Sequence, residues 1–151
     1  MNTNLAVSNI MTTELITVNP DDKLDKVQQI FKDHLIHHIP VVDSGRQLKG
    51  MISKVDMLTF LNNLSTQTTG PTWSKYQFST LTASRVMTAK LITIEPDDTM
   101  GLAADIFLSN KLHALPVVES GELLGLVTTH DLLKFAFKDT VEAKEGWGIT
   151  Q

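Results

Sequence analysis

The sequence has no cysteine among its 151 residues. This absence excludes a disulfide framework, thiol catalysis and thiolate metal sites. No apolar run approaches the roughly 18 residues of a membrane-spanning helix, and the chain does not open with the charged and then apolar run of a secretory signal. Basic residues are also scarce, with 13 against 17 acidic residues and a net charge of −4, which disfavours nucleic-acid binding. We therefore expect a cytoplasmic protein whose partners include neither a nucleic-acid polymer nor a membrane.

The residues that are present describe an ordinary globular chain. Hydrophobic residues make up 42% of the sequence and charged residues 20%, which disfavours intrinsic disorder. Since domains contain about 150 residues, the length allows one globular unit or two very small ones. Composition alone says nothing more about function.

The most informative property of the sequence is an internal repeat. Residues 11–45 and 87–121 share 16 identities in 35 aligned positions. The repeat includes LITVNPDD at 15–22, which returns as LITIEPDD at 91–98. Two copies are too few for a solenoid. We therefore expect a pseudo-symmetric pair of motifs that share one core.

Each copy predicts the order strand, helix, strand, strand, helix. In the first copy, a β-branched run at 15–18 precedes Pro-Asp-Asp, a helix-start signal in which an aspartate accepts an early amide proton. Apolar residues at helical spacing follow, then a short strand at 39–42 ended by Ser-Gly, a return strand at 48–53 and a second helix from about Lys54. The second copy has the equivalent elements at 91–94, 115–118, 123–128 and from about Thr129.

The repeat also predicts how the chain is divided. We expect motifs at 7–61 and 83–138, a Ser/Thr-rich linker at 62–82 and a loosely held tail at 139–151. A connection as long as this linker is either a spacer or functional. We expect its aromatic residues to pack against the domain, with contact to a ligand or partner as the alternative; they are Trp73, Tyr76 and Phe78.

The strongest local chemistry ends each copy, in GMISKVD at 50–56 and GLVTTHD at 125–131. The glycine tolerates close backbone approach, and the strand then delivers a hydroxyl to a helix N-terminus, where free amide groups attract phosphate. The aspartate three residues later can accept both hydroxyl protons of a ribose. Ser/Thr-x-x-Asp equally predicts a capping box, which is purely structural. The residues concerned are Ser53 with Asp56 and Thr128 with Asp131.

In this combination the sequence resembles a tandem pair of CBS (cystathionine β-synthase) domains, called a Bateman module, over about residues 7–61 and 83–137. The residues that carry the resemblance are Met11-Thr12 and Met87-Thr88, Thr17 and Thr93 between apolar residues, Pro40 and Pro116 in Pro-Val-Val, and the two Gly…Ser/Thr-x-x-Asp endings. The resemblance implies an α/β (α+β) fold of two pseudo-symmetric β-α-β-β-α motifs packed through their sheets, which leaves two clefts.

In the CBS family such clefts commonly hold AMP, ADP, ATP or S-adenosylmethionine, so the resemblance implies an adenine nucleotide as a regulatory ligand. By position, the first cleft would place Ile16, Thr17 and Val18 beside the adenine, His38, Ile39 and Pro40 as a wall, Asp56 on the ribose, and Ser53 and Lys54 near phosphate. The second would likewise use Ile92, Thr93 and Ile94, then Ala114, Leu115 and Pro116, with Asp131 on the ribose and Thr128 and His130 near phosphate.

The sequence departs from the family where several phosphates would be bound. Family members that bind polyphosphates often carry arginine or lysine just before the aspartate, whereas this chain carries Val55 and His130. Valine offers a phosphate nothing, and histidine is doubly protonated only near or below about pH 6.5. We therefore expect the second cleft to be the better nucleotide site, and AMP or adenosine-like ligands to bind in preference to ATP.

Enzyme motifs are missing. The sequence has no phosphate-binding glycine loop, nucleophile elbow or His-Glu-x-x-His. The aspartate pairs at 21–22 and 97–98 precede helices, where capping is expected rather than acid–base catalysis. A histidine cluster can bind a metal ion, but the strand expected near Ile39 should interrupt the helical face that two of these histidines would share, so we expect no metal. The cluster consists of His34, His37 and His38.

We therefore predict a non-catalytic regulatory module in which the ligand shifts the population of two arrangements. The signal would pass to an effector protein or across a homodimer. One alternative is a structural dimerisation module with empty clefts, and a second is a small metal-dependent enzyme built on the histidine cluster. The expected dimer interface is the apolar part of the second helices, around Leu58, Phe60, Leu61, Phe135 and Phe137.

Overall fold

The structure is a computed structural model, and it describes residues 3–67, 76 and 78–138. These residues belong to two compact units, each with its own hydrophobic cluster. The first-repeat unit contains Leu15–Leu91 and Ser120–Leu123. The second-repeat unit contains Met1–Glu14, Ile92–Glu119 and Leu124–Gln151.

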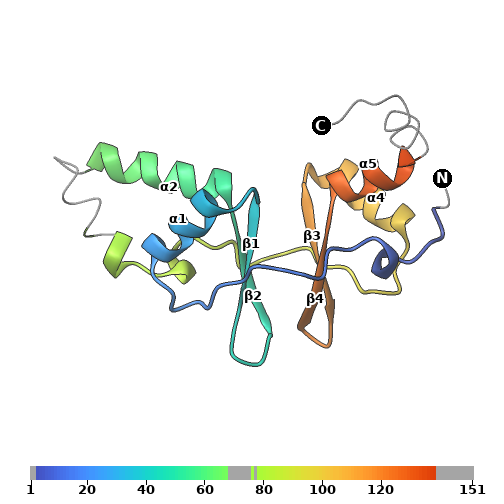
Figure 1. Ribbon diagram of the computed structural model, residues 1–151, viewed down its shortest axis with the longest axis horizontal. Helices are drawn as coiled ribbons and strands as arrows, with labels where there is room; N and C mark the ends of the chain where they lie inside the picture. The colour runs from blue at the N-terminus through green and yellow to red at the C-terminus, as the bar shows by residue number, and fades with distance from the viewer. Residues whose placement is uncertain (1–2, 68–75, 77, 139–151) are drawn as a thin grey trace. The chain divides into compact units, whose positions relative to one another are not determined.

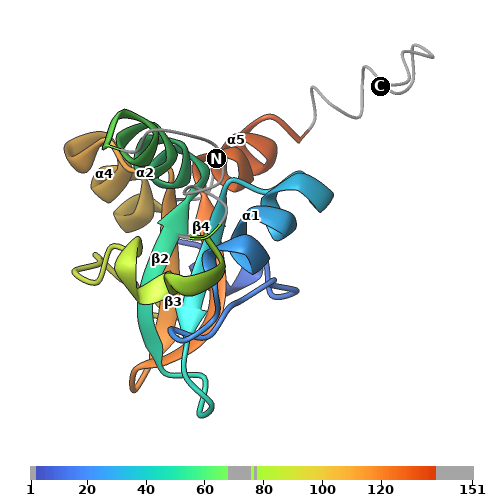
Figure 2. The same ribbon diagram turned by 90° about the vertical axis from the view of Figure 1, so that its left-hand side faces the viewer.

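The first-repeat unit is a two-stranded antiparallel hairpin with helices on one face. Its hairpin consists of β1 (His38–Val42) and β2 (Leu48–Ser53), with Val41 opposite Gly50 in the register. Figure 1 shows its two main helices on the same side of this hairpin, and Figure 2 views the unit from that side. The helices are α1 (Leu24–Asp33), α2 (Lys54–Gln67) and the short 3₁₀ helix η2 (Ala83–Arg85).

The second-repeat unit repeats this arrangement. The tip of its hairpin, residues 120–123, is grouped with the first-repeat unit. Its elements are the 3₁₀ helix η1 (Val7–Asn9), α4 (Met100–Asn110), β3 (Ala114–Glu119), β4 (Glu122–Thr128) and α5 (Thr129–Ala136). The structure thus confirms the mixed α/β fold, both hairpins and the starting points of both second helices. Within the described ranges, no helix is both long enough and apolar enough to cross a membrane.

The first strand predicted in each copy is reduced to a single residue. Val18 forms a parallel bridge with Val41, and Ile94 forms the equivalent bridge with Val117. The Val18 N–H donates to the carbonyl of Pro40 at 3.1 Å. The ladder cannot grow because proline has no N–H to donate and because the chain turns at the following Pro-Asp-Asp. The predictions of regular strands at 15–18 and 91–94 were therefore wrong in extent.

The Pro-Asp-Asp segments also act differently from the prediction. Asp22 accepts the N–H of Asn19 at 2.8 Å, and Asp98 accepts the N–H of Glu95 at 2.8 Å. These aspartates close a turn before the helix rather than capping the helix itself. The cap of α4 is Thr99, whose hydroxyl accepts from the Leu102 N–H at 3.1 Å.

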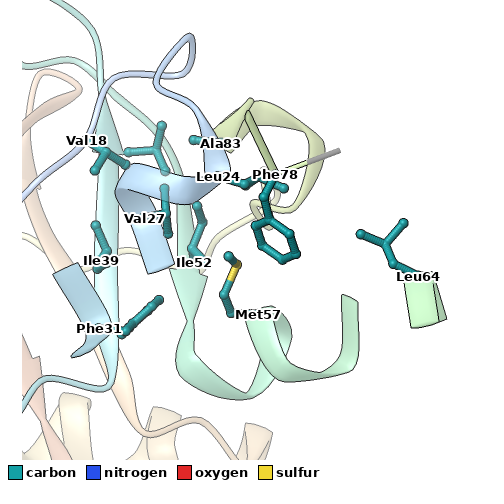
Figure 3. Packing of buried hydrophobic residues seen from close by; sticks show 11 residues of the cluster. Val18, Leu24, Val27, Phe31, Ile39, Ile52, Met57, Leu64, Phe78 and Ala83 are labelled. Atoms are coloured by element: carbon teal, nitrogen blue, oxygen red, sulfur yellow. The ribbon is translucent and has the colours of Figure 1, made fainter. Parts of the chain in front are cut away.

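The connection at 62–82 contributes to the core of the first-repeat unit. Helix α2 continues through its beginning to Gln67. Phe78 is only 6% exposed and belongs to the core cluster, which Figure 3 shows together with Leu64 and Met57 of α2. Tyr76 is 62% exposed, so the expected packing of the aromatic residues is confirmed for Phe78 and wrong for Tyr76. Trp73 lies outside the described residues.

Each repeat begins with a segment that belongs to the unit of the other repeat. Residues 1–14 are part of the second-repeat unit, whereas residues 83–91 are part of the first-repeat unit. Val7 and Ala83, the first residues of η1 and η2, are fully buried in the two core clusters. The boundaries of the compact units therefore differ from those of the sequence repeats.

Candidate functional site

Both Ser/Thr-x-x-Asp segments form the same reciprocal turn at the start of a helix. Asp56 N–H donates to Ser53 Oγ at 2.9 Å, and Ser53 N–H donates to Asp56 Oδ2 at 3.3 Å. Asp131 N–H donates to Thr128 Oγ1 and Thr128 N–H donates to Asp131 Oδ2, each at 3.0 Å. These turns are capping boxes, so the structural alternative for these residues is realised in both copies.

The capping box does not use every hydrogen-bonding group of the two side chains in each turn. Each carboxylate accepts the capping bond through Oδ2, and a carboxylate has a second oxygen with further lone pairs. Each hydroxyl accepts one hydrogen bond and keeps its own proton to donate. The side chains of all four residues are partly exposed. A role in the helix start and a role in ligand binding are therefore compatible at the same residues.

In the first-repeat unit, backbone pairing holds the predicted site segments next to one another. Residue 18 pairs with β1, as its bridge to Val41 shows. His38 at the start of β1 lies opposite Ser53 at the end of β2. The Lys54 N–H, at the start of α2, donates to the carbonyl of His37 at 2.8 Å. The structure thus brings residue 18 and the segments at 38–40 and 53–56 together at one hairpin and its adjoining turn.

The second-repeat unit uses the same backbone bonds. The Ile94 N–H donates to the Pro116 carbonyl at 3.0 Å, and the Thr129 N–H donates to the His113 carbonyl at 3.1 Å. His113 and His37 occupy equivalent positions, and in both cases the carbonyl anchors the first residue of the second helix. The backbone of both histidines therefore has a structural role at the helix-to-strand turn.

The predicted contact residues divide into buried and accessible side chains. Val18 and Ile39 lie in the core of the first-repeat unit, as Ile94 and Leu115 do in the other. Such residues can meet a ligand only through backbone groups, and Pro40, Ala114 and Pro116 are also buried. The predicted residues with partly or fully exposed side chains are Ile16, Thr17, His38, Ser53, Lys54, Asp56, Ile92, Thr93, Thr128, His130 and Asp131.

Gly50 and Gly125 allow close backbone approach, but the approaching group is part of the chain itself. A Cβ atom on Gly50 would lie 2.7 Å from the Sδ atom and 2.9 Å from the last carbonyl oxygen of Met87-Thr88. On Gly125 it would lie 2.8 Å and 2.9 Å from the same atoms of Met11-Thr12. The pattern of Met-Thr pairs was visible in the sequence, but their packing on the glycines was not predicted.

The two turns differ in the side chains that follow the hydroxyl. The first turn continues with Lys54, which is exposed, and Val55, which is 70% exposed. The second continues with Thr129 and the exposed His130. Each turn therefore carries one group that could be cationic, an ammonium in the first and an imidazole in the second.

Two turns of the first-repeat unit each lower the pKa of an aspartate. Burial acts to raise the pKa of Asp22, but the N–H of Asn19 and the Lys26 ammonium outweigh it, so the pKa is lowered. Lys26 Nζ lies 3.1 Å from the Asp22 carboxylate. The pKa of Asp43 is lowered chiefly by the N–H of Gln47, with further bonds in the β1–β2 loop.

The histidine cluster does not form a metal site in the part of the chain that the structure describes. Helix α1 ends at Asp33 and β1 begins at His38, so His34 and His38 share no helical face, as predicted. Among the residues described, no group of three histidine, cysteine, aspartate or glutamate side chains is placed to hold a metal ion.

The second helices expose part of the predicted apolar surface. Leu58 is 53% exposed and Phe137 is 56% exposed. The other three residues named for this surface are half-buried against the core of their own unit, Phe60 and Leu61 in one and Phe135 in the other. Two of the five residues named for this surface are therefore well exposed, and its use as a homodimer interface remains a prediction.

Comparison with known proteins agrees with the repeat. A family model described as CBS domain matches residues 7–63 and 83–138. A CBS domain-containing protein of Dictyostelium discoideum is 30% identical over 134 residues, which cover 87% of this chain and 91% of the relative. Inosine-5′-monophosphate dehydrogenase of Korarchaeum cryptofilum is 34% identical over 120 residues, or 79% of this chain and 22% of the enzyme.

A third relative is also much longer than the matched region. Homoserine O-acetyltransferase of Methanosalsum zhilinae is 29% identical over 132 residues, which cover 87% of this chain and 24% of the enzyme. This chain thus spans about a quarter of the length of each of these two enzymes. The likeness is confined to that portion of each enzyme.

Solved structures share the fold. CBSX2, crystallised in complex with AMP, has a TM-score of 0.74 and 24% identity, covering 89% of this chain and 98% of its own. The CBS domain pair of protein MJ0100, in complex with 5′-methylthioadenosine and S-adenosyl-L-methionine, has a TM-score of 0.72 and 22% identity, with 89% and 98% coverage. At these identities the likeness establishes a common fold.

Proposed function

Because this chain belongs to the CBS domain family, we propose that it is a regulatory module that binds an adenine nucleotide and catalyses no reaction itself. The observation that carries this proposal is the paired turn. Each repeat presents a partly exposed hydroxyl and a partly exposed carboxylate at a helix N-terminus. Helix N-termini favour phosphate, and a carboxylate suits the two hydroxyls of a ribose.

The ligand class is supported by proteins of the same fold. CBSX2 was crystallised with AMP, and the pair from MJ0100 with 5′-methylthioadenosine and S-adenosyl-L-methionine. These ligands share the adenosine group and differ in what is attached to its 5′ carbon. We therefore propose that the features common to both turns bind the adenosine. The side chains that differ between the turns would set the preference for the group on the 5′ carbon.

In the first site, Asp56 would bind the ribose and Ser53 with Lys54 would face the phosphate. Ile16, Thr17 and His38 would offer side chains to the adenine, while Val18, Ile39 and Pro40 would offer backbone groups. In the second site Asp131, Thr128 and His130 would take the polar roles. The adenine would there lie against Ile92 and Thr93 and the backbone of Ile94, Ala114, Leu115 and Pro116.

Each turn contains at most one group that can carry positive charge, which favours a ligand with one phosphate. Lys54 is the only lysine or arginine in the first turn, and the second turn has none. Each added phosphate brings further negative charge that needs a cationic partner. We therefore propose that AMP binds better than ADP or ATP.

The second site should be the stronger one. His130 occupies the position directly before the aspartate, where the first site has Val55. An imidazole can donate a hydrogen bond to phosphate in its neutral form and adds charge when protonated, whereas valine provides neither. Lys54 follows the hydroxyl directly in the first site, and its long flexible side chain must be ordered to contribute, at a cost in conformational entropy.

The bound ligand would act by population shift. It would favour whichever arrangement of the two units binds it more tightly, and the change would reach an effector protein or the second subunit of a homodimer. Leu58 of α2 and Phe137, which directly follows α5, are two exposed apolar residues that such a dimer could cover. The cytoplasm is the compartment in which we expect this to occur.

A calorimetric panel tests the proposed function. The chain is titrated with AMP, ADP, ATP and S-adenosylmethionine, with GMP as a base control. We expect heat with AMP and a weaker response with GMP. The absence of heat with every adenine compound would contradict the proposal and support a structural dimerisation module, and ATP binding far more tightly than AMP would contradict the one-phosphate preference. Stoichiometric metal in protein purified without an affinity tag would instead favour the metal-dependent enzyme.

A further inference from the structure

Two methionines occupy matched positions that combine access with tight packing. Met11 and Met87 are partly exposed. Three others are buried in the described part of the chain, Met51 at 6%, Met57 at 3% and Met100 at 1% exposure. An oxidant in solution therefore reaches the side chains of Met11 and Met87 more readily than those of the other three, because methionine oxidation follows exposure.

The sulfur atom of each of these two methionines packs against a buried glycine. The distances of 2.7 Å from Met87 Sδ and 2.8 Å from Met11 Sδ to a Cβ built on the glycine leave no room for even one additional carbon atom on Gly50 or Gly125. The residue after each methionine exchanges two backbone hydrogen bonds with the strand that carries the glycine. Thr88 exchanges hydrogen bonds of 2.9 Å and 3.0 Å with Met51, and residue 12 exchanges bonds of 2.8 Å and 2.9 Å with residue 126.

The glycines lie on the strands that end in the two capping boxes. Gly50 is three residues before Ser53, and Gly125 is three residues before Thr128. The paired residues 51 and 126 lie between the glycine and the hydroxyl in each strand. A change in the packing of the methionine is therefore transmitted along a short and hydrogen-bonded strand to the side chains proposed to hold the nucleotide.

We propose that Met11 and Met87 are oxidation sites through which peroxide weakens both candidate nucleotide sites. In this reaction the thioether sulfur attacks one oxygen of hydrogen peroxide. The S–O bond forms as the O–O bond breaks, and the second oxygen leaves as water after proton transfer. Sulfur is oxidised by two electrons and peroxide is reduced. The sulfoxide is polar, so it disrupts the apolar contact that the thioether makes.

The loss of this contact loosens the pairing of residues 12 and 88 with the strands. The second-repeat unit and the first-repeat unit should respond alike, because the methionine, the glycine and the backbone pair are equivalent in both. The effect on nucleotide affinity rests on the proposed function, whereas the order of oxidation and the loss of stability do not.

The test exposes the native full chain to hydrogen peroxide, stops the reaction with catalase and maps the oxidised peptides by mass spectrometry. We expect the gain of about 16 Da for one oxygen to appear on Met11 and Met87 before Met51, Met57 and Met100. The melting temperature should fall as these two sites react. Equal rates at all five methionines, or an unchanged melting temperature after both sites have reacted, would overturn the proposal.

Leucine variants provide the controls, since leucine and methionine are similar in volume and exchange at little cost. Met11→Leu/Met87→Leu should keep its melting temperature under the same peroxide exposure, whereas Met57→Leu should lose stability as the wild type does. If the double variant folds poorly, the single variants should each prevent part of the loss. Loss of stability in the double variant equal to that of the wild type would contradict the assignment.

The final arm measures AMP affinity before and after oxidation. We expect oxidation to lower it by roughly 2- to 30-fold, the range of coupling found for residues that act through the structure, and a methionine sulfoxide reductase should restore it. Full AMP affinity in the oxidised protein would refute the link to the nucleotide sites. Absence of AMP binding by the untreated protein would instead contradict the proposed function, while the mapping and melting results still decide whether these are oxidation sites.

Discussion

The two repeats build the same turn with different surroundings. In both repeats, the first N–H of the second helix donates a hydrogen bond to a histidine carbonyl. A capping box between a Ser or Thr and an aspartate then holds the candidate site. Around it, α2 has 14 residues against 8 in α5, and Phe78 enlarges only the first core. The comparison teaches that the backbone of the site is duplicated, while the core around it and its charged side chains differ between the two repeats.

The largest expected effect concerns the extra core of the first-repeat unit. Phe78→Ala should lower the free energy of unfolding by about 3–5 kcal/mol, because it leaves a cavity in a buried cluster. Tyr76→Ala, a change in a neighbouring exposed ring, should remain within about 0.5 kcal/mol of the wild type. Urea unfolding measures both variants. Equal losses in the two would show that the segment around residue 78 does not belong to the core.

The next effect tests whether the two glycine contacts are equivalent. Gly50→Ala and Gly125→Ala should each cost about 1–3 kcal/mol in unfolding free energy, because a new methyl group overlaps a sulfur atom and a backbone carbonyl. As a control, Gly45→Ala introduces a Cβ atom whose nearest contact is 3.5 Å away. A loss of stability in only one of the Gly50→Ala and Gly125→Ala variants, with both variants still folded, would show that the two glycine contacts are not equivalent.

A smaller effect should follow the single side chain that distinguishes the two sites. Val55→His adds a phosphate donor to the first site, and His130→Val removes it from the second. We expect AMP affinity to rise in the first variant and fall in the second, each at the site concerned and by roughly 2- to 12-fold, the net value of one hydrogen bond. Calorimetry fitted to two sites measures the change. Unaltered affinity in both variants would remove the assigned role of His130.

The smallest effect concerns the turn before α1. Because the pKa of Asp22 is lowered from 3.8, its ionised form contributes stability above that value, and the contribution is lost as pH falls through the folded-state pKa. Lys26→Leu copies Leu102 of the second repeat and should cost at most about 0.5 kcal/mol at neutral pH. Urea unfolding should show this difference shrinking in acid. A loss that is constant with pH would exclude the ion pair as its cause.

Much of the fold could be predicted because the repeat shows the same signals twice. The strands around Pro40 and Pro116 and the helices from Lys54 and Thr129 follow from apolar runs, turns and capping residues. The lengths of the strands at 15–18 and 91–94 were overestimated. A β-branched run does not reveal that the strand it pairs with carries a proline, which has no N–H to donate. Likewise, the sequence did not decide whether an aspartate before a helix closes the preceding turn or caps the helix itself.

The candidate site was less predictable. The sequence identified Ser53, Asp56 and their counterparts, but only the structure shows that each pair satisfies a capping box. The packing of Met87 on Gly50 depends on contacts between residues far apart in the chain, which spacing along the sequence does not report. The sequence predicted that both Phe78 and Tyr76 pack against the domain. Composition could not show that Phe78 is buried while Tyr76 is exposed.

The central claim is that these turns bind nucleotide in addition to capping their helices, and that the second binds better. The most direct measurement is AMP titration of Asp56→Asn and Asp131→Asn. The asparagine oxygen can still accept the capping bond, whereas the carboxylate charge is lost. We expect Asp131→Asn to weaken the tighter site by roughly 10- to 150-fold, the value of hydrogen bonds to a charged group, and Asp56→Asn to affect only the weaker site. AMP affinities equal to the wild type in both folded variants would contradict the claim.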